Sequence, residues 1–482
     1  MAGLDHGKWG KRTSRTGSAG NVKVAEAVYQ QCIDARCGAT YGIEQVLAAC
    51  PACGDLLDVR YDWDRLPVPD SLRAFESRWA SRDRPLDFSG VWRFRELLNF
   101  CEDRFKVTLG EGQTICQPNP AVAEYVGAAR DGLFLQYEGL NPSGSFKDNG
   151  MVAAFSHARM VGARRVACAS TGNTSASMAL YAAHVGMQAI VFVGAGRIAF
   201  GKMAQALDYG ARTLEIEGNF DACMRQVKLA AERCGLYLMN SVNPFRLEGQ
   251  KTIMYRVLEA LHWEVPDWII VPGGNLGNSS AFGKAFAELK QLGLIDRIPR
   301  LAVINSTGAD TLDRLVNQRH LTFNAGHYDR QAIADDWRWQ DRTERRPSTI
   351  ASAIEIAKPV NAAKCLRALE VCDGVVRAVP DSEIMDAKAQ VGRYGLGCEP
   401  ASAASVAGLR RLIAEGVVGR NQRVVCVLTG HPLKDPDATV GYHTGHYKPG
   451  KDVRGPRTFA NQPVRVVDDI EQICQAIEGM DS

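Results

Sequence analysis

The sequence of 482 residues contains no apolar run of the roughly 18 residues that a membrane-spanning helix needs. Its N-terminus lacks the apolar core of a secretory signal peptide, and residues 1–24 are instead polar, basic and rich in Gly and Ser. With 57 Lys and Arg against 54 Asp and Glu, no excess of charge points to a nucleic acid or a membrane surface. We therefore expect a cytoplasmic protein with no nucleic-acid or membrane partner and a disordered tail over residues 1–24.

Several common catalytic patterns are missing as well. The nine histidines form no metal-binding pattern, and no serine occupies a G-x-S-x-G turn. The sequence has no internal repeat. A hydrophobic share of 46% with 23% charged residues is ordinary for a globular protein, and the length suits one to three domains. The chemistry of this chain must therefore be sought in its cysteines, lysines and glycine-rich turns.

Two close pairs of cysteines lie near the start of the chain. Cys32 and Cys37 are followed, after a short loop, by Cys50 and Cys53, and a Pro and a Gly favour a tight turn at the second pair. Two thiolate pairs at this spacing suit a tetrahedral zinc site. We therefore predict a zinc-ribbon-like segment over residues 25–62 with these four ligands. Two alternatives remain open, a ribbon that folds without metal and two unrelated thiol pairs.

From about residue 107 onwards, short apolar strands alternate with helical stretches. This alternation predicts parallel βαβ units and an α/β fold. The expected strands are residues 133–138, 166–170, 188–193, 213–217, 268–271 and 424–428, and the expected helices are residues 151–160, 175–185, 199–209, 221–233 and one after Ser280.

One lysine is notable for its position between a predicted strand and a predicted helix. Lys147 lies in the stretch Asn141-Pro-Ser-Gly-Ser-Phe-Lys-Asp148. A lysine at such a turn can reach into a cleft and form a Schiff base with an aldehyde cofactor. Taken alone, the stretch is also typical of an ordinary surface turn, since Asn, Pro, Ser and Gly all favour turns.

Two further segments lie at strand-to-helix junctions. In Gly273-Gly-Asn-Leu-Gly-Asn278 the glycines allow the backbone to approach an anion, and the N–H groups of the following helix point toward it. The segment lacks the spacing of a dinucleotide fold and the ending of a P-loop. In Ser170-Thr-Gly-Asn-Thr174, the residue types also suit simple helix capping.

Together these three segments resemble the fold-type II pyridoxal-phosphate enzymes, and within them the threonine synthases. The resemblance covers roughly residues 30–440. It implies an α/β fold similar to the tryptophan synthase β-subunit, with two lobes of parallel-rich sheet flanked by helices. The large lobe is expected over residues 63–149 and 250–482 and the small lobe over residues 150–249, with the cofactor between them. A homodimer is expected as well.

The resemblance also implies roles for single residues. Lys147 is the lysine that carries the cofactor, and residues 109–114 and 397–402 are expected to line the walls of the site. The expected cofactor ligands are Asn173 at the 3-hydroxyl, Thr429 at the pyridine nitrogen, and Gly274, Asn275, Leu276, Gly277 and Asn278 at the phosphate. The expected ligands of the substrate carboxylate are Ser170, Thr171 and Thr174.

The segment from residue 240 to residue 251 indicates which kind of substrate the protein binds. Arg246, with Asn240 and Ser241, can bind a second anion because a guanidinium matches phosphate through its bidentate fork. The alternative is an ordinary ion pair at a helix start. Threonine synthases carry nearly the same string, which implies that these residues bind the phosphate of a phosphorylated amino-acid substrate. Lys202 is a weaker candidate for the same phosphate.

The reaction that the resemblance implies converts O-phospho-L-homoserine and water to L-threonine and phosphate, by γ-elimination followed by β-addition of water. The chain would then be a lyase of threonine biosynthesis. One departure from the family pattern is the stretch 304–309, where an alanine-rich sequence is expected. The alternatives are cysteate synthase or a related β-replacement enzyme, an amino-acid dehydratase, which Arg246 disfavours, and a zinc-ribbon regulatory protein with a relict enzyme domain.

Overall fold

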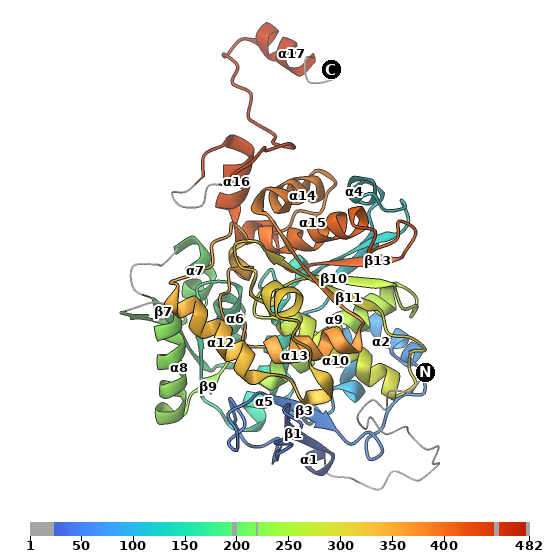
Figure 1. Ribbon diagram of the computed structural model, residues 1–482, viewed down its shortest axis with the longest axis vertical. Coiled ribbons are helices and arrows are strands. Elements are labelled where there is room, and N and C mark those ends of the chain that lie inside the picture. The colour runs from blue at the N-terminus through green and yellow to red at the C-terminus, as the bar shows by residue number, and fades with distance from the viewer. Residues whose placement is uncertain (1–23, 195–199, 218–219, 448–452, 479–482) are drawn as a thin grey trace.

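In the computed structural model, which describes residues 24–194, 200–217, 220–447 and 453–478, the strands form three separate sheets (Figure 1). The tail expected over residues 1–24 lies outside the described residues, except for Val24, where the short helix α1 (Val24–Ala27) begins. No helix in the described ranges is both long and apolar enough to cross a membrane.

The largest sheet has six strands in the order β12-β11-β10-β13-β5-β4. Neighbouring strands are parallel, except that β4 runs antiparallel to β5 at one edge. Every residue of β10 and β13 is buried, because helices cover both faces of the sheet. The bounds are β4 Ile115–Pro118, β5 Leu133–Tyr137, β10 Trp268–Pro272, β11 Arg300–Ser306, β12 Val375–Val379 and β13 Val424–Leu428.

The second sheet has four parallel strands in the order β8-β7-β6-β9. Alternate residues of β6 pack on opposite faces: Val166 and Cys168 join the main core, whereas Ala167 and Ala169 pack with residues of α8. The bounds are β6 Arg165–Ala169, β7 Gln188–Gly194, β8 Arg212–Ile216 and β9 Tyr237–Leu238. All four strands lie within residues 150–249, the range expected for the small lobe.

The third sheet is the cysteine ribbon, an antiparallel sheet in the order β2-β1-β3. Its strands are β1 Val28–Cys32, β2 Thr40–Gly42 and β3 Leu57–Tyr61. The ribbon lies at the bottom of the view in Figure 1, below α9, α10 and α13. Cys32 ends β1 and pairs with Leu57, which begins β3.

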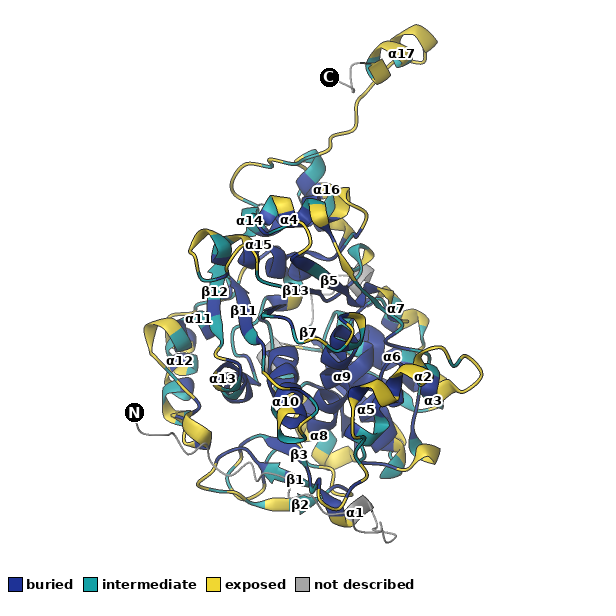
Figure 2. Cartoon of the chain, turned by 90° about the vertical axis from the view of Figure 1, so that its right-hand side faces the viewer, coloured by how far each residue is buried: buried dark blue, intermediate teal, exposed yellow. Residues whose placement is uncertain are grey.

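The longer helices lie around the six-stranded and four-stranded sheets, except for α17, and Figure 2 shows that α5, α9 and α10 are mostly buried. They are α4 Pro120–Val126, α5 Lys147–Met160, α6 Asn173–Val185, α7 Phe200–Asp208, α8 Phe220–Cys234, α9 Pro244–Ala260, α10 Gly277–Gln291, α12 Arg330–Arg342, α13 Ala362–Val371, α14 Asp381–Arg393, α15 Pro400–Ala414, α16 Pro436–Thr444 and α17 Ile470–Glu478.

Short helices connect these elements. They are η1 Leu72–Phe75, α2 Glu76–Trp79, α3 Pro85–Phe88, η2 Trp92–Leu97, η3 Asp103–Phe105, η4 Glu138–Leu140, α11 Thr311–Asp313, η5 Arg314–Gln318, η6 Asn324–Gly326, η7 Ser352–Ile354 and η8 Pro432–Lys434. The helix α17 stands apart from the rest of the chain at the top of Figure 1.

The expected α/β fold with parallel-rich sheets is confirmed, but two helix starts differ from the prediction. α5 begins at Lys147 rather than Met151, and α10 begins at Gly277 rather than after Ser280. In both helices the first turn contains Gly, Asn, Ser or charged residues, which hide the apolar periodicity. As a result, Lys147 is the first residue of a helix instead of a member of the preceding turn.

Candidate active site

Three neighbouring strands deliver three predicted site segments to one edge of the large sheet. In the order β10-β13-β5, all three strands are parallel. Their carboxyl ends are followed by the phosphate-type turn at Gly274, by Thr429, and by the turn that leads to Lys147. Parallel sheets commonly bind ligands at this edge. The order of the strands therefore brings together residues that are nearly 300 positions apart.

Lys147 occupies the N-terminal position of α5 and is partly exposed. Its Nζ lies 4.1 Å from the ring centroid of Phe146. Burial by the surrounding atoms lowers the pKa of Lys147 to about 7, the Arg246 guanidinium adds to this effect, and the Glu399 carboxylate opposes it. A substantial fraction of this amine is therefore unprotonated at neutral pH, as a nucleophile requires.

A buried hydrogen-bond network holds the turn before Lys147. The Glu138 carboxylate accepts from Asn141 Nδ2 at 2.8 Å, from Asn149 Nδ2 at 2.7 Å and from Arg256 Nη2 at 2.6 Å. The network joins residues on both sides of Lys147 to α9. Glu138 is fully buried, and both of its carboxylate oxygens accept hydrogen bonds. The network therefore fixes the backbone position of Lys147.

The glycine-rich turn has the geometry of an anion-binding loop. Leu276 has the left-handed φ of 64° and precedes α10, whose first N–H groups have no partner within the helix. A Cβ at Gly273 would lie 2.7 Å from Asn305 Nδ2, and a Cβ at Gly274 would lie 3.1 Å from the Ala353 carbonyl oxygen. A side chain at Gly273 would force its neighbours to shift, and one at Gly274 would be tightly packed against the backbone.

Asn361, which the sequence analysis did not single out, ties this turn to the start of α9. Its Nδ2 donates to the Ser241 carbonyl oxygen at 3.1 Å and to the Asn275 carbonyl oxygen at 3.3 Å. Asn361 is fully buried, and its Oδ1 has no hydrogen-bond partner among the described residues. No local signal marks this asparagine, because both of its partners are distant in the sequence.

The Ser170–Thr174 segment lies at the carboxyl end of β6, and its residues are partly exposed. Asn173 begins α6, and its Nδ2 donates to both oxygens of Glu399, at 3.1 and 3.0 Å. Thr171 and Thr174 flank it at the start of the helix. The segment is therefore joined through Glu399 to the start of α15, which packs on the large sheet.

Glu399 is the functional candidate that sequence reasoning undervalued, since residues 397–402 were expected only to line the walls. Its carboxylate is 4% exposed and also accepts from Thr429 Oγ1 at 3.3 Å. Burial raises the pKa of Glu399. Thr429 Oγ1 lies 2.9 Å from Ser402 Oγ. Glu399 thus contacts both residues that were predicted to bind the cofactor ring.

Arg246 is a deeply buried cation with incomplete hydrogen bonding. Its side chain is 1% exposed, and Nη1 donates to the Met239 carbonyl oxygen at 2.9 Å. Nε and Nη2 have no partner among the described residues. Burial lowers the pKa of Arg246, so the guanidinium would be stabilised by an anion. A surface ion pair, the alternative reading of this residue, is excluded by its burial.

The close packing of α5 against α9 brings Arg246 near Lys147. A Cβ at Gly249 would lie 1.8 Å from the Asn149 carbonyl oxygen, and a Cβ at Gly150 would lie 3.0 Å from the Arg246 carbonyl oxygen. Glycine at both positions allows the two helix backbones to touch. The Arg246 charge consequently influences the pKa of Lys147.

The other predicted phosphate ligands differ in their surroundings. The Asn240 side chain pairs with the backbone of Ala169, accepting from its N–H and donating to its carbonyl oxygen, both at 3.1 Å. Asn240 therefore anchors the end of β6, next to Ser170. Ser241 is partly exposed beside Asn361. Lys202 belongs to α7, and its side chain lies outside the described residues.

The four predicted metal ligands gather in the ribbon. The sulfur atoms of Cys32, Cys37, Cys50 and Cys53 all lie within 4.8 Å of one another. Burial by itself raises the pKa of Cys50, but the Tyr41 hydroxyl, 3.3 Å from its sulfur, and nearby backbone groups lower this pKa to about 7. A cluster of four thiols with one readily ionised member suits a thiolate-bound metal ion.

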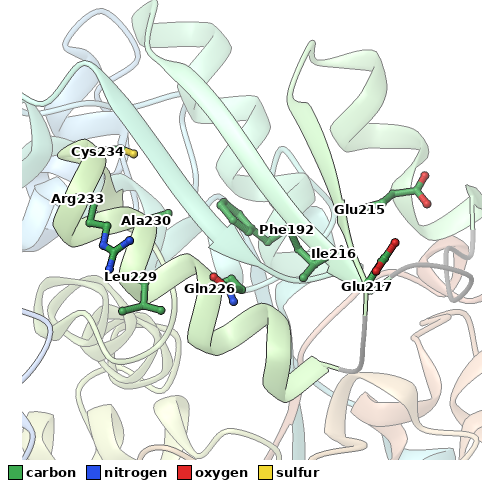
Figure 3. Close-up of a pocket in the computed structure, with 9 residues that line it drawn as sticks. All are labelled: Phe192, Glu215, Ile216, Glu217, Gln226, Leu229, Ala230, Arg233 and Cys234. Atoms are coloured by element: carbon green, nitrogen blue, oxygen red, sulfur yellow. The ribbon is translucent and has the colours of Figure 1, made fainter.

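A separate surface pocket of about 440 Å³ lies between α8 and the ends of β7 and β8 (Figure 3). Its lining combines the acidic Glu215 and Glu217 with Arg233 and apolar side chains. None of the predicted site residues lines it. The pocket is therefore distinct from the predicted site around Lys147.

The residues at this edge of the large sheet fit pyridoxal phosphate. The unprotonated fraction of Lys147 suits an aldehyde, and the turn at residues 273–278 with the N-terminus of α10 suits a phosphate. Asn278 adds a buried side chain whose Oδ1 has no partner among the described residues. An amine, an anion-binding loop and polar groups for a ring thus lie at one edge of the large sheet.

Comparison with known proteins agrees with this chemistry. A family model described as "Pyridoxal-phosphate dependent enzyme" matches residues 107–430, more than half of the chain. The chain therefore belongs to the pyridoxal-phosphate-dependent enzymes and, by its curated relatives, to the threonine synthases within them. The threonine synthase of Methanocaldococcus jannaschii is 40% identical over 412 residues, which cover 85% of this chain and 94% of that protein. The threonine synthase of Synechocystis is 41% identical over 358 residues, covering 74% and 86%.

Solved structures show the same fold. The threonine synthase of Escherichia coli superposes with a TM-score of 0.60 at 18% identity, covering 94% of this chain and all of that one. Maize serine racemase superposes with a TM-score of 0.51 at 21% identity, covering 66% of this chain and 88% of that one. The expected fold-type II architecture is thereby confirmed. The family membership also confirms that the chain is a pyridoxal-phosphate-dependent enzyme rather than a regulatory protein with a relict domain.

Proposed function

We propose that this enzyme converts O-phospho-L-homoserine and water to L-threonine and phosphate, with Lys147 as the residue that carries the cofactor. The observation that carries the proposal is the buried Arg246 guanidinium: two of its nitrogens have no partner among the described residues, and its charge adds to the lowering of the Lys147 pKa by burial. A second anion beside the cofactor lysine is what a phosphorylated amino acid would supply.

Pyridoxal phosphate, when bound, supplies the electron sink that stabilises negative charge at the substrate's Cα. In this proposal Lys147 removes the proton from Cα and then a proton from Cβ. Phosphate leaves from Cγ, the proton taken from Cβ is returned to Cγ to form the methyl group, water adds at Cβ as hydroxyl and a proton, and Lys147 returns a proton to Cα. One amine can serve all these carbons because a substrate held at both ends keeps them within its reach.

The substrate would be held at both ends. Ser170, Thr171 and Thr174, at the N-terminal end of α6, are the proposed ligands of its carboxylate. Arg246, with Ser241, Asn240 and Lys202, is the proposed phosphate side. The Asn240 side-chain amide is hydrogen-bonded to the backbone of Ala169. We therefore propose that Asn240 positions the carboxylate ligands relative to the phosphate ligands and does not bind the substrate directly.

The cofactor would be held from three directions. Asn173 at the 3-hydroxyl and Thr429 at the pyridine nitrogen are supported by their shared contact with Glu399. Residues 274–278 at the phosphate are supported by the turn geometry and by the N-terminus of α10. A neutral hydroxyl at the ring nitrogen leaves that nitrogen unprotonated.

A phosphate-release assay tests the proposal. Purified enzyme with pyridoxal phosphate is given phosphohomoserine or phosphoserine, the latter with and without sulfite. We expect phosphate and threonine from phosphohomoserine, with a much lower rate from phosphoserine. Release from phosphoserine that depends on sulfite, with none from phosphohomoserine, would reject the proposed substrate and favour cysteate synthase.

We further propose that the ribbon, residues 25–62, holds zinc through Cys32, Cys37, Cys50 and Cys53, and that the enzyme is a cytoplasmic homodimer. The clustered sulfur atoms support the metal.

All the cysteines are free thiols, which suits a reducing compartment. Exposed apolar residues near the C-terminus, among them Val464, Val467 and Ile470, support association of two chains.

A further inference from the structure

The ribbon is bound to the catalytic part of the chain through its edge strand, β3. Lys364 of α13 donates to the Leu57 carbonyl oxygen at 2.7 Å, and Lys284 of α10 donates to the Val59 carbonyl oxygen at 2.6 Å. Both lysine side chains are buried. The free edge of the ribbon sheet is therefore bound by two buried ammonium groups, as its carbonyl groups require.

The side chains of β3 extend the same attachment. Asp58 is buried and pairs with Lys364, at 3.0 Å, and with Arg367. The Tyr61 hydroxyl donates to Glu248 of α9 at 2.6 Å. These contacts join one strand of the ribbon to three helices, α9, α10 and α13. Because the paired charges are buried, displacing the strand would leave them uncompensated.

Glu248 also links the helices to one another. It forms ion pairs with Lys251 of α9, at 2.7 Å, and with Lys284 of α10. Lys251 in turn pairs with Glu288 of α10 at 2.6 Å. The ribbon thus attaches to a buried charge network that sets how α9 lies against α10.

All three helices begin at the proposed cofactor and substrate site. α10 begins at Gly277 in the phosphate turn, and α9 carries Arg246 in its first turn. α13 begins directly after Asn361, which donates to Asn275 of the phosphate turn and to Ser241. The ribbon binds each helix within about two turns of these starts, so a shift of β3 is transmitted to the site through rigid elements.

The cysteine cluster lies beside the first residue of β3. Cys32 pairs in register with Leu57, the first residue of β3, and Cys53 precedes that strand by four positions. An ion bound by all four sulfur atoms would join the end of β1 to the loops on both sides of β2. The geometry of β3 is then a consequence of metal binding, as in other small ribbons whose folding depends on metal.

We infer that the four cysteines form a tetrahedral site for an ion of the zinc class, and that this ion supports the cofactor pocket through β3, so that metal binding and pyridoxal-phosphate binding are coupled. The inference rests on the proposed function in taking residues 274–278 as the cofactor's phosphate loop. The ribbon therefore acts as an internal support of the active site.

Cofactor affinity with and without zinc tests the inference on the full-length enzyme. Zinc is removed from the folded protein with a chelator, and pyridoxal phosphate is titrated by its absorbance. We expect about one zinc per chain before treatment, and a cofactor Kd about 5–150-fold higher after it, the usual range of coupling between two sites. By reciprocity, the cofactor must raise zinc affinity by the same factor. Restored zinc should restore the Kd.

A substitution in β3 distinguishes the loss of its contacts with the helices from unfolding of the ribbon. Asp58→Asn removes the charge that binds Lys364 and Arg367 but leaves all four cysteines, so it should keep zinc and weaken cofactor binding. Glu44→Gln, an exposed carboxylate of the ribbon, is the matched control and should change neither.

Three results would overturn the inference: wild-type protein that binds no zinc, a folded zinc-free protein with an unchanged cofactor Kd, and Asp58→Asn with normal cofactor binding. Failure of the proposed function looks different, because the zinc-loaded wild type would then bind no pyridoxal phosphate at all or would release no phosphate from phosphohomoserine.

Discussion

The Asn173 side-chain amide donates to both carboxylate oxygens of Glu399, at 3.1 and 3.0 Å, although the two residues are 226 positions apart. Asn173 begins a helix of the four-stranded sheet, and Glu399 immediately precedes a helix that packs on the six-stranded sheet. The pair therefore links the elements of the four-stranded sheet to those of the six-stranded sheet. It places an anion beside Lys147, and this anion opposes the lowering of the lysine pKa.

The first prediction concerns that anion. Glu399→Gln removes a charge that stabilises the protonated form of Lys147, so the pKa of Lys147 should fall below its value of about 7. Cofactor is added to the cofactor-free protein, and its rate of attachment is measured by stopped-flow absorbance. The pH at which this rate is half-maximal should be lower in the variant. Glu124→Gln, at an exposed position, is the control. An unchanged half-maximal pH would show that the Glu399 charge does not act on Lys147.

The second prediction concerns Lys147 itself. Only the unprotonated amine attacks an aldehyde, so the rate of cofactor attachment should rise about tenfold per pH unit below pH 7 and level off above it. Borohydride reduction followed by peptide mapping should find the cofactor on Lys147. Lys147→Ala should fold but lose the label and the turnover, whereas Lys228→Ala, on the surface of α8, should keep both. Label on any other lysine would reject the assignment.

The third prediction separates the two phosphates. Removing one partner of a buried charge pair typically costs about 2–5 kcal/mol, so Arg246→Gln should lower kcat/KM for phosphohomoserine about 30-fold or more. Cofactor absorbance should remain, because residues 274–278 still bind the cofactor's phosphate. Arg225→Gln, which is exposed, should retain full activity. Loss of the cofactor together with activity would mean that Arg246 binds the cofactor's phosphate.

The fourth prediction concerns the contact between α5 and α9. Gly249→Ala places a Cβ 1.8 Å from the Asn149 carbonyl oxygen, so the helices must separate, at a cost of about 1–3 kcal/mol of unfolding free energy. The separation should also move Arg246 away from Lys147 and raise the pKa of Lys147.

The matched control for that variant is Gly392→Ala. Gly392 is also helical, in α14, and a Cβ there meets nothing within 4 Å. Its substitution should be neutral or stabilising by up to about 1 kcal/mol, because alanine favours helix over glycine. Chemical denaturation of both variants measures the difference. Equal stability of the two variants would show that α5 and α9 are not in close contact at Gly249.

Predictions from local sequence succeeded where a few adjacent residues determine the structure. Residues 424–428 were predicted as a strand and form β13, because a short apolar run buried on both faces has a recognisable composition. The strand-to-helix turns before Lys147 and at Gly274 were recognised because Asn, Pro, Ser and Gly favour turns. Helix starts were less accurate, since the polar residues that bind ligands at Lys147 and Gly277 obscure the apolar pattern.

Other residues acquired their importance only from contacts across the fold. Glu399 and Asn361 have polar partners more than 80 positions away, and no pattern in the neighbouring sequence predicts those partners. The attachment of β3 to three helices depends in the same way on Lys284 and Lys364, which resemble ordinary helix lysines in the sequence.

The sequence by itself determined the chemical groups of this enzyme: an amine at a strand-to-helix turn, a glycine-rich anion loop, an arginine suited to a phosphate and two close pairs of thiols. Each is encoded within a few residues, because turn geometry and helix termini are local properties. The tertiary structure decided which groups act on one another. The pKa of Lys147 depends on Arg246 and Glu399, and their distances from the amine follow from the packing of helices and the order of strands, since electrostatic effects depend on spatial separation rather than on sequence separation.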